Sequence, residues 1–144
     1  VGATLDTKTA NLGGVQTAYE GYAIYSTLMR YDVRTSTFVP HVAEALEPND
    51  DASVWTLKLR PEVVFGNGDP LNADAVVAHI DRQFAEDSTS RPKQTSKPYI
   101  ASYTKVDDMT VEFTLTALYG NFPTLLSGQL GMVQNVNVIN EVGE

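Results

Sequence analysis

The stretch Val54–Val77 does most to constrain the fold, because it joins a strand signal, a tight turn and a helix start within a short span. Apolar and polar residues alternate over Val54–Leu59, which is typical of an antiparallel strand with one buried and one solvated face. The glycine-rich segment Gly66–Pro70 predicts a tight turn. Asn72 is placed to cap a helix over Ala73–Glu86, with its apolar residues on one face.

The rest of the chain supplies further elements of both kinds. Alternation predicts strands over Tyr103–Val106 and Val111–Leu115, with a turn at Asp107–Met109 between them. Apolar residues at steps of three and four predict a helix over Val15–Tyr25, and LMRYDV after it reads as a strand. We therefore expect an α+β fold with a mostly antiparallel sheet and packed helices, forming a single domain over residues 1–144.

Several shorter segments carry weaker signals. Pro40 disfavours helix before it, so a short helix is expected over HVAEAL. The polar, proline-containing Asp87–Pro98 is predicted to be a long, mobile surface loop. Asn121 is a candidate cap for a short helix that has Pro123 in its first turn and ends near Gly128. The sequence MVQNVNV offers a possible strand, followed by a weak terminal helix.

The predicted core follows from the apolar faces of these elements. The aromatic and branched residues of the strands and of the 73–86 helix should pack together, since each element has one apolar face. We expect the core to contain Trp55, Leu57, Leu59, Phe65, Val76, Ile80, Phe84, Val111, Phe113 and Leu115.

Composition excludes several classes of function. The chain of 144 residues has 42% hydrophobic residues and a formal net charge of −8, so a nucleic-acid partner is not expected. It has no cysteine, which excludes disulfides, thiol nucleophiles and cysteine metal ligands. No apolar run approaches the roughly 18 residues of a membrane-spanning helix.

No group of residues in the sequence has the spacing of a catalytic or metal site. His41 and His79 lack metal-ligand spacing, and His79 is expected to be a partly exposed structural histidine at the edge of its helix's apolar stripe. Asp74 and Asp81 share one helix face, which we interpret as solvated. The acidic and glycine-rich turns lack the pattern of a calcium or phosphate loop. We expect no catalytic residue, metal or cofactor.

A set of motifs supports a resemblance to a known family. YSTLMRYD and PHVAEAL are similar to Tyr-Glu-Gly-Leu-x-x-Tyr-Asp and Pro-x-Leu-Ala-Glu, and DDMTVEFTL and NFPTLL resemble two later motifs. The central block is the most specific, with matches at Trp55, Thr56, Leu59, Arg60, Phe65, Gly68, Pro70, Leu71, Ala73 and Val76. Together these motifs resemble the bacterial extracellular solute-binding proteins of family 5, the oligopeptide, dipeptide and nickel type.

Two departures from the family pattern bear on local structure. Ala75 stands where the family has an acidic residue, so the capping box is lost and Asn72 is left to cap its helix alone. Ser26 and Thr27 replace a Glu-Gly pair, which changes the bend before the first predicted strand.

The resemblance implies a function for the parent protein. It implies the amino-terminal sub-domain of a two-lobed periplasmic-binding-protein type receptor, with the rest of the receptor absent from residues 1–144. The parent would bind a small solute, a peptide by preference, and deliver it to the permease subunits of an ABC importer outside the cytoplasm, in the periplasm or as a cell-surface lipoprotein. A nickel chelate, a sugar or an opine stays open as solute. The alternatives are a piece of an enzyme with its catalytic residues elsewhere, or a structural or adhesive surface domain.

The resemblance also implies where a ligand would lie. In such receptors the loop between the first strand and the first helix borders the cleft. Here the first strand is expected over VGATLD, and the loop after it contains Asn11, Leu12, Gly13 and Gly14. The glycines would let backbone amides approach a ligand, and the asparagine could form hydrogen bonds with it. Tyr99 is a further candidate, for stacking on a ligand side chain. The alternative is that the glycine-containing segment is only a helix-entry loop.

Overall fold

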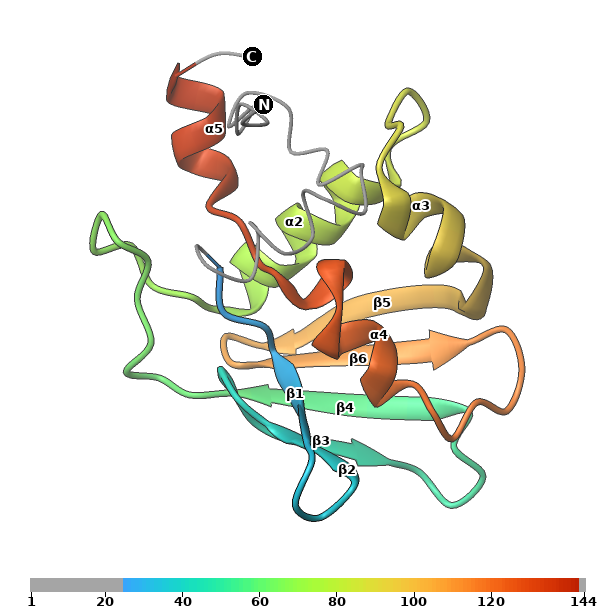
Figure 1. The fold of residues 1–144 in the computed structure, drawn as a ribbon. Coiled ribbons are helices and arrows are strands. Elements are labelled where there is room, and N and C mark those ends of the chain that lie inside the picture. The colour runs from blue at the N-terminus through green and yellow to red at the C-terminus, as the bar shows by residue number, and fades with distance from the viewer. Residues whose placement is uncertain (1–24, 143–144) are drawn as a thin grey trace, which may run out of the picture.

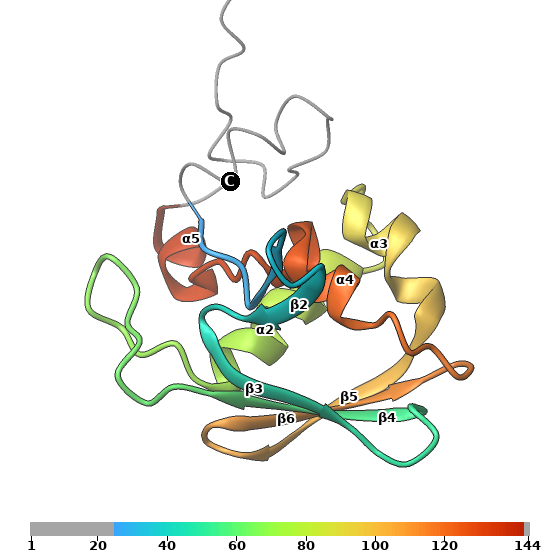
Figure 2. The same cartoon turned by 60° about the horizontal axis from the view of Figure 1, so that its bottom comes forward.

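The computed structural model describes residues 25–142, and these form a layer of helices packed on one face of an antiparallel sheet (Figure 1). Figure 2 shows helices α2, α3 and α4 on one side of the sheet and the other side uncovered. The predicted α+β class is confirmed. The strands are β1 (Met29–Asp32), β2 (Thr37–Pro40), β3 (Ala43–Pro48), β4 (Val54–Leu59), β5 (Ile100–Asp107) and β6 (Thr110–Leu115). The helices are α2 (Ala73–Phe84), α3 (Arg91–Thr95), α4 (Pro123–Ser127) and α5 (Val136–Val142), with short 3-10 turns η1 (Lys97–Tyr99) and η2 (Gln129–Gly131).

The main sheet has four strands in the order β3-β4-β6-β5, and all its pairs are antiparallel. β4 and β6 form the centre, with Trp55 opposite Phe113 and Leu57 opposite Val111. β1 and β2 form a separate two-stranded hairpin. All three strands predicted by alternation are present, and β5 begins earlier than expected.

Helix α2 begins and ends with identifiable contacts. Asn72 caps it, since its side-chain oxygen accepts a hydrogen bond from the backbone N–H of Ala75 at 3.0 Å. At the other end Lys97 Nζ donates to the carbonyl oxygen of Phe84 at 3.0 Å, and Lys93 Nζ donates to that of Glu86. Lys97 thus satisfies a carbonyl that the helix leaves unpaired, and Lys93 binds the chain just beyond the helix end. Both ammonium groups lie near the negative end of the helix dipole, which favours positive charge.

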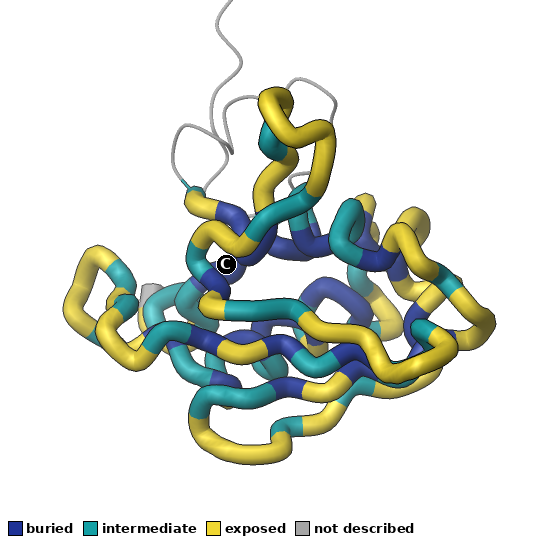
Figure 3. Tube along the Cα trace, turned by 90° about the horizontal axis from the view of Figure 1, so that it is seen from below, coloured by how far each residue is buried: buried dark blue, intermediate teal, exposed yellow. Residues whose placement is uncertain are grey.

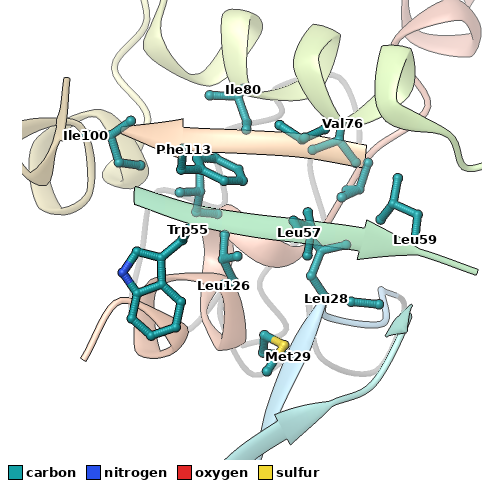
Figure 4. Close-up of a cluster of buried hydrophobic side chains, with 14 of the residues drawn as sticks. Leu28, Met29, Trp55, Leu57, Leu59, Val76, Ile80, Ile100, Phe113 and Leu126 are labelled. Atoms are coloured by element: carbon teal, nitrogen blue, oxygen red, sulfur yellow. The ribbon is translucent and has the colours of Figure 1, made fainter. Parts of the chain in front are cut away.

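The core lies between the helices and the inner face of the sheet (Figure 4). Val76 and Ile80 of α2 are buried against the central strands, and the ring centroids of Phe113 and Phe122 lie 5.2 Å apart. Nine of the ten predicted core residues are buried. The exception is Phe65, which is only partly buried and packs at the margin of the core.

The short helix predicted over HVAEAL is wrong, because the segment from Ala43 to Pro48 is the edge strand β3. Six residues are too few to distinguish a helical from a strand period. Pairing decides the outcome: Leu46 lies opposite Leu57, and Ala43 donates its backbone N–H to the carbonyl oxygen of Leu28. Partners distant in sequence thus override the local signal.

The long loop predicted over Asp87–Pro98 is also wrong, since it contains α3 and the beginning of η1. Ser90 caps α3 by accepting a hydrogen bond from the backbone N–H of Lys93, and it donates its hydroxyl hydrogen to the carbonyl oxygen of Gln83 at 2.7 Å. This buried serine ties the segment to the end of α2. Ser90 as the cap and Pro92 in the first turn are signals of a helix start, whereas the polar, proline-containing composition of the segment favoured a loop.

The remaining predictions have mixed outcomes. α4 ends at Gly128 as expected, but Phe122 is its N-cap residue and Asn121 provides no side-chain cap. The terminal helix is α5, and no strand precedes it within residues 132–135. The helix expected over Val15–Tyr25 lies outside the described residues except for Tyr25, which is not helical.

The uncovered face of the sheet is polar. Seen from below, exposed and buried residues alternate along the strands (Figure 3). On the uncovered face, Lys58 Nζ and a carboxylate oxygen of Glu47 form an ion pair at 3.0 Å between neighbouring strands. An exposed pair of this kind stabilises the fold by less than about 1 kcal/mol.

Phe84→Ala should reduce the free energy of unfolding by about 3 kcal/mol, because truncating a buried aromatic loses its transfer energy and leaves a cavity. Phe84 is 7% exposed and packs edge-to-face on Tyr103. Urea titration would measure the change. Val33→Ala is the control, since Val33 is 80% exposed and its truncation should change stability by less than about 0.5 kcal/mol. A loss below about 1 kcal/mol for Phe84→Ala would contradict this account of the core.

Gly131→Ala should destabilise the fold by about 3 kcal/mol or more, because the added methyl has no room. A Cβ at Gly131 would lie 1.8 Å from the carbonyl oxygen of Leu126, whereas one at Gly128 would meet nothing closer than 3.7 Å. Gly128→Ala is therefore the matched control and should be well tolerated. Thermal unfolding of the two variants would decide, and equal melting temperatures would show that the backbone at Gly131 shifts freely.

Candidate functional site

Tyr99, the ligand-stacking candidate within the described residues, lies at the end of η1 on the surface. Its ring stacks on that of Tyr119, with centroids 4.9 Å apart and an interplanar angle of 17°. Tyr99 is 44% exposed, and Leu118, next to Tyr119, is 69% exposed. We name the pair Tyr99 and Tyr119 the tyrosine stack.

The backbone that carries the tyrosine stack is held by hydrogen bonds to the end of β6. The backbone N–H of Thr116 donates to the carbonyl oxygen of Tyr99 at 3.1 Å, and the Thr116 hydroxyl donates to that of Pro98 at 2.9 Å. At Tyr119 the backbone N–H of Phe122 donates to the tyrosine's carbonyl oxygen at 3.1 Å, so the backbone of each tyrosine has a partner. Positioning of this kind lowers the entropy cost of using a ring as a contact surface.

The tyrosine stack offers contact surfaces and hydroxyl groups, and nothing in its geometry arranges a nucleophile beside a base. Two stacked phenols offer an apolar face and hydroxyls that donate and accept hydrogen bonds, which suits contact with a ligand side chain or backbone. Sequence analysis missed Tyr119, because it lies in a loop where no periodicity marks a role. An aromatic residue beside glycine in a loop, LYGN, was the only available signal.

The other ligand-binding candidates are not placed by the structure. Asn11, Leu12, Gly13 and Gly14 lie outside the described residues. Tyr99 is therefore the predicted site residue whose surroundings the structure describes.

His79 was predicted to be partly exposed, and this is wrong: it is 1% exposed, under the segment that follows α4. Its Nε2 lies 3.2 Å from the carbonyl oxygen of Leu130, and its Nδ1 accepts a hydrogen bond from the backbone N–H of Gln134 at 3.3 Å. A carbonyl only accepts and an amide N–H only donates, so the ring is neutral with its hydrogen on Nε2. Both ring nitrogens are used within the fold, which gives His79 a structural role.

A buried polar network extends from His79. Gln134, whose backbone meets the histidine, is 6% exposed and accepts a hydrogen bond from the side-chain amide of Gln83 at 3.4 Å. Its own amide donates to the hydroxyl of Tyr25 at 3.5 Å. The network joins α2 to two segments far from it in sequence, and it fixes their positions because buried polar groups are costly without partners.

The two aspartates on the face of α2 are not a catalytic pair, and both are exposed as predicted. Asp74 pairs with Lys105 of β5 at 2.8 Å, and Asp81 accepts a hydrogen bond from the Tyr103 hydroxyl at 2.6 Å. Hydrogen bonds from Lys105 to Asp108 and Asp74 raise the pKa of the lysine to about 12. Burial, followed by the bond to Asp81, raises the pKa of the Tyr103 hydroxyl. These contacts attach α2 to the sheet.

Within residues 25–142 the structure places no three histidine or acidic side chains where they could share a metal ion. In the same part of the chain, none of the helices has the length and apolar character needed to cross a membrane.

Solved structures with this fold belong to the solute-binding parts of transporters. The substrate-binding domain of an oligopeptide ABC transporter from Bacillus anthracis superposes with a TM-score of 0.85 at 20% identity, over 95% of this chain and 29% of that chain. A nickel ABC transporter structure from Bacillus halodurans gives a TM-score of 0.68 at 29% identity, over 79% of this chain and 23% of that chain. The fold is thus that of one part of each of these longer chains.

The family itself is shown by sequence. The sequence model described as "Bacterial extracellular solute-binding proteins, family 5 Middle" matches residues 37–141, and the chain belongs to this family. This confirms the resemblance inferred from the motifs.

Curated relatives are several times longer than this chain. The glutathione-binding protein GsiB of Pectobacterium atrosepticum is 28% identical over the whole chain, which covers 28% of that protein. The dipeptide-binding protein of Escherichia coli is 30% identical over 69% of the chain, covering 22% of that protein. The chain therefore spans less than a third of the length of the relatives it matches.

Stability should fall as the pH decreases from 7 to 4.5, because burial lowers the pKa of His79 from 6.5 to about 4. Between these values the unfolded state binds the proton and the folded state does not, so acid favours unfolding by about 2 to 3 kcal/mol at pH 4.5. Urea titrations at both pH values would measure this loss.

Two variants isolate the contribution of His79 to this loss. His79→Gln should reduce the pH dependence, whereas His41→Gln, at an exposed histidine, should retain it. The same loss of stability in His79→Gln as in the unaltered chain would contradict the assignment.

Proposed function

We propose that the chain is the amino-terminal sub-domain of an extracytoplasmic solute receptor that serves an ABC importer, with a peptide as solute. Family membership is the observation that carries this proposal. The relatives named for binding glutathione and a dipeptide, and the fold shared with an oligopeptide transporter's substrate-binding domain, support a peptide. The receptor's permease partners and its place in the periplasm or on a lipid anchor are parts of the same proposal.

The tyrosine stack is proposed to contact the solute. Tyr99 is partly exposed, its backbone is held by Thr116 just after β6, and its ring stacks on that of Tyr119. A ring held in place in this way can pack on a peptide side chain without specifying its identity. The loop containing Asn11, Leu12, Gly13 and Gly14 is proposed to supply backbone contacts to the same solute.

An enzymatic role is the alternative, and the described residues favour binding over chemistry. The buried histidine has both nitrogens bonded within the fold, and the aspartates of α2 are each engaged by β5. The proposal is therefore that the protein binds and releases its solute unchanged.

Native mass spectrometry and calorimetry on a full-length receptor containing this chain would test the proposal. A mixture of di-, tri- and tetrapeptides should yield a bound peptide of unchanged mass, whereas turnover of the peptides would favour the enzyme. The 144-residue chain alone should give no calorimetric heat with the same mixture, because a partial cleft leaves most of a ligand solvated.

Tyr99→Ala in the full-length receptor should weaken peptide binding about fivefold, because an aromatic contact contributes about 1 kcal/mol. Tyr99→Phe should retain most of the affinity, since it keeps the stacked ring. Tyr31→Ala is the control, because Tyr31 is equally exposed but lies on the β1–β2 hairpin. Unchanged affinity in Tyr99→Ala would remove the tyrosine stack from the site.

A further inference from the structure

Residues 60–71, between β4 and α2, form a projecting arm that contains the Gly66–Pro70 turn and is visible beside the sheet in Figure 1. Phe65 and Asp69 close its tip through a bond from the backbone N–H of Phe65 to the Asp69 carbonyl oxygen at 2.8 Å. Gly68 has φ of +93°, which glycine adopts without strain, and its N–H donates to the Phe65 carbonyl oxygen at 2.9 Å. The turn prediction is confirmed.

The side chain of Asn67, at this tip, belongs to a cluster of three polar residues. Its amide donates to a carboxylate oxygen of Asp69 at 2.8 Å, and its own oxygen accepts from the side-chain amide of Asn135 at 3.2 Å. Asn135 also donates to Asp69 at 2.7 Å. The oxygen of Asn135 accepts from the backbone N–H groups of Asn137 and Val138, so the same side chain caps α5.

We propose that the side chain of Asn67, which precedes Gly68, is a site of deamidation, and that Asn135 controls the rate of this reaction. The backbone nitrogen of Gly68 attacks the side-chain carbonyl carbon of Asn67, a C–N bond forms, and the amide nitrogen leaves as ammonia with the proton from Gly68. Water then opens the cyclic imide at either carbonyl to give aspartate or isoaspartate. The net change is amide plus water to carboxylate plus ammonium, with no change in oxidation state.

The surroundings of Asn67 favour this reaction over the other asparagines. Asn67 is the only asparagine in the sequence that is followed by glycine. Because glycine has no Cβ, nothing obstructs the approach of the attacking nitrogen. Nothing lies within 4 Å of a Cβ built at Gly68, and Asn67 is exposed to the water that the second step consumes. Asparagine is among the thermally labile residues of proteins.

The native contacts slow the reaction. The attacking nitrogen donates its hydrogen to Phe65, and the carbonyl under attack is held by Asn135 and by the backbone N–H of Asp69 at 3.2 Å. Reaction therefore requires local opening of the tip, whose free energy depends on these bonds. Because the Asn135 side chain bonds to the tip of the arm and also caps α5, it links local opening of the tip to this helix.

Deamidation would in turn weaken the tip of the arm. A carboxylate at position 67 cannot donate to Asp69, and it places a second negative charge beside the first. The side-chain amide of Asn135 can still donate to both carboxylates, so the contact that is lost is the one between residues 67 and 69. The closed tip should consequently open more readily in aged protein.

The test is to incubate the 144-residue chain at pH 8 and 37 °C and to follow amide-to-acid conversion at each asparagine by peptide mapping. Conversion should be faster at Asn67 than at Asn140, which is exposed within α5. Asn135→Ser removes the donors to the arm but keeps an oxygen that can cap α5, so conversion at Asn67 should accelerate about fivefold, the factor that one typical hydrogen bond contributes. Asn137→Ser is the control and should leave the rate unchanged.

Two outcomes would overturn the proposal. Conversion at Asn67 no faster than at Asn140 would show that the site is not reactive. An unchanged rate in Asn135→Ser, with the melting temperature preserved, would show that Asn135 does not control it. Peptide binding enters neither measurement, so the result is independent of the receptor function.

Discussion

The pairing of β4 with β6 is the interaction on which the rest of the structure depends. It joins two strands that are far apart in sequence, and it sets Trp55 opposite Phe113 at the centre of the core. Helix α2 is attached to the same pair, since the backbone N–H of Ala73 donates to the carbonyl oxygen of Asp108 in the turn before β6. The register of the other strands and the position of the helical layer follow from this one long-range pairing. Bringing β4 and β6 together closes a long loop, and the entropy cost of this closure must be offset by the burial of the strands and of α2.

Elements with a clear period and their own end signals could be predicted from sequence. β4, β6 and α2 have one apolar face each, and Asn72 marks the start of α2. β3 could not be predicted, because its strand character comes from the partner β4 and its six residues show no distinct period. In the candidate site Tyr99 could be proposed, but its partner Tyr119 could not, since only the fold brings η1 beside the loop after β6.

The segment after α4 shows why burial of a polar residue is hard to predict. His79 occupies the edge of an apolar stripe, and such a residue is exposed unless another segment covers it. Here residues 130–134 cross over it and provide an acceptor and a donor from their backbone. That crossing is possible because Gly131 has no side chain where it meets the backbone of Leu126. A glycine in one segment therefore decides the burial of a histidine in another.

The lysines have a consequence for the electrostatic potential of this acidic chain. In the part of the chain that the structure describes, each lysine ammonium is bound within the fold. Lys58 and Lys105 bind carboxylates, Lys97 binds the last carbonyl of α2, and Lys93 binds the carbonyl of Glu86 just beyond that helix. The positive charges are thus held close to negative groups or dipole ends, which reduces their field at a distance. With a formal net charge of −8, the long-range field attracts cations and lowers the encounter rate of anions.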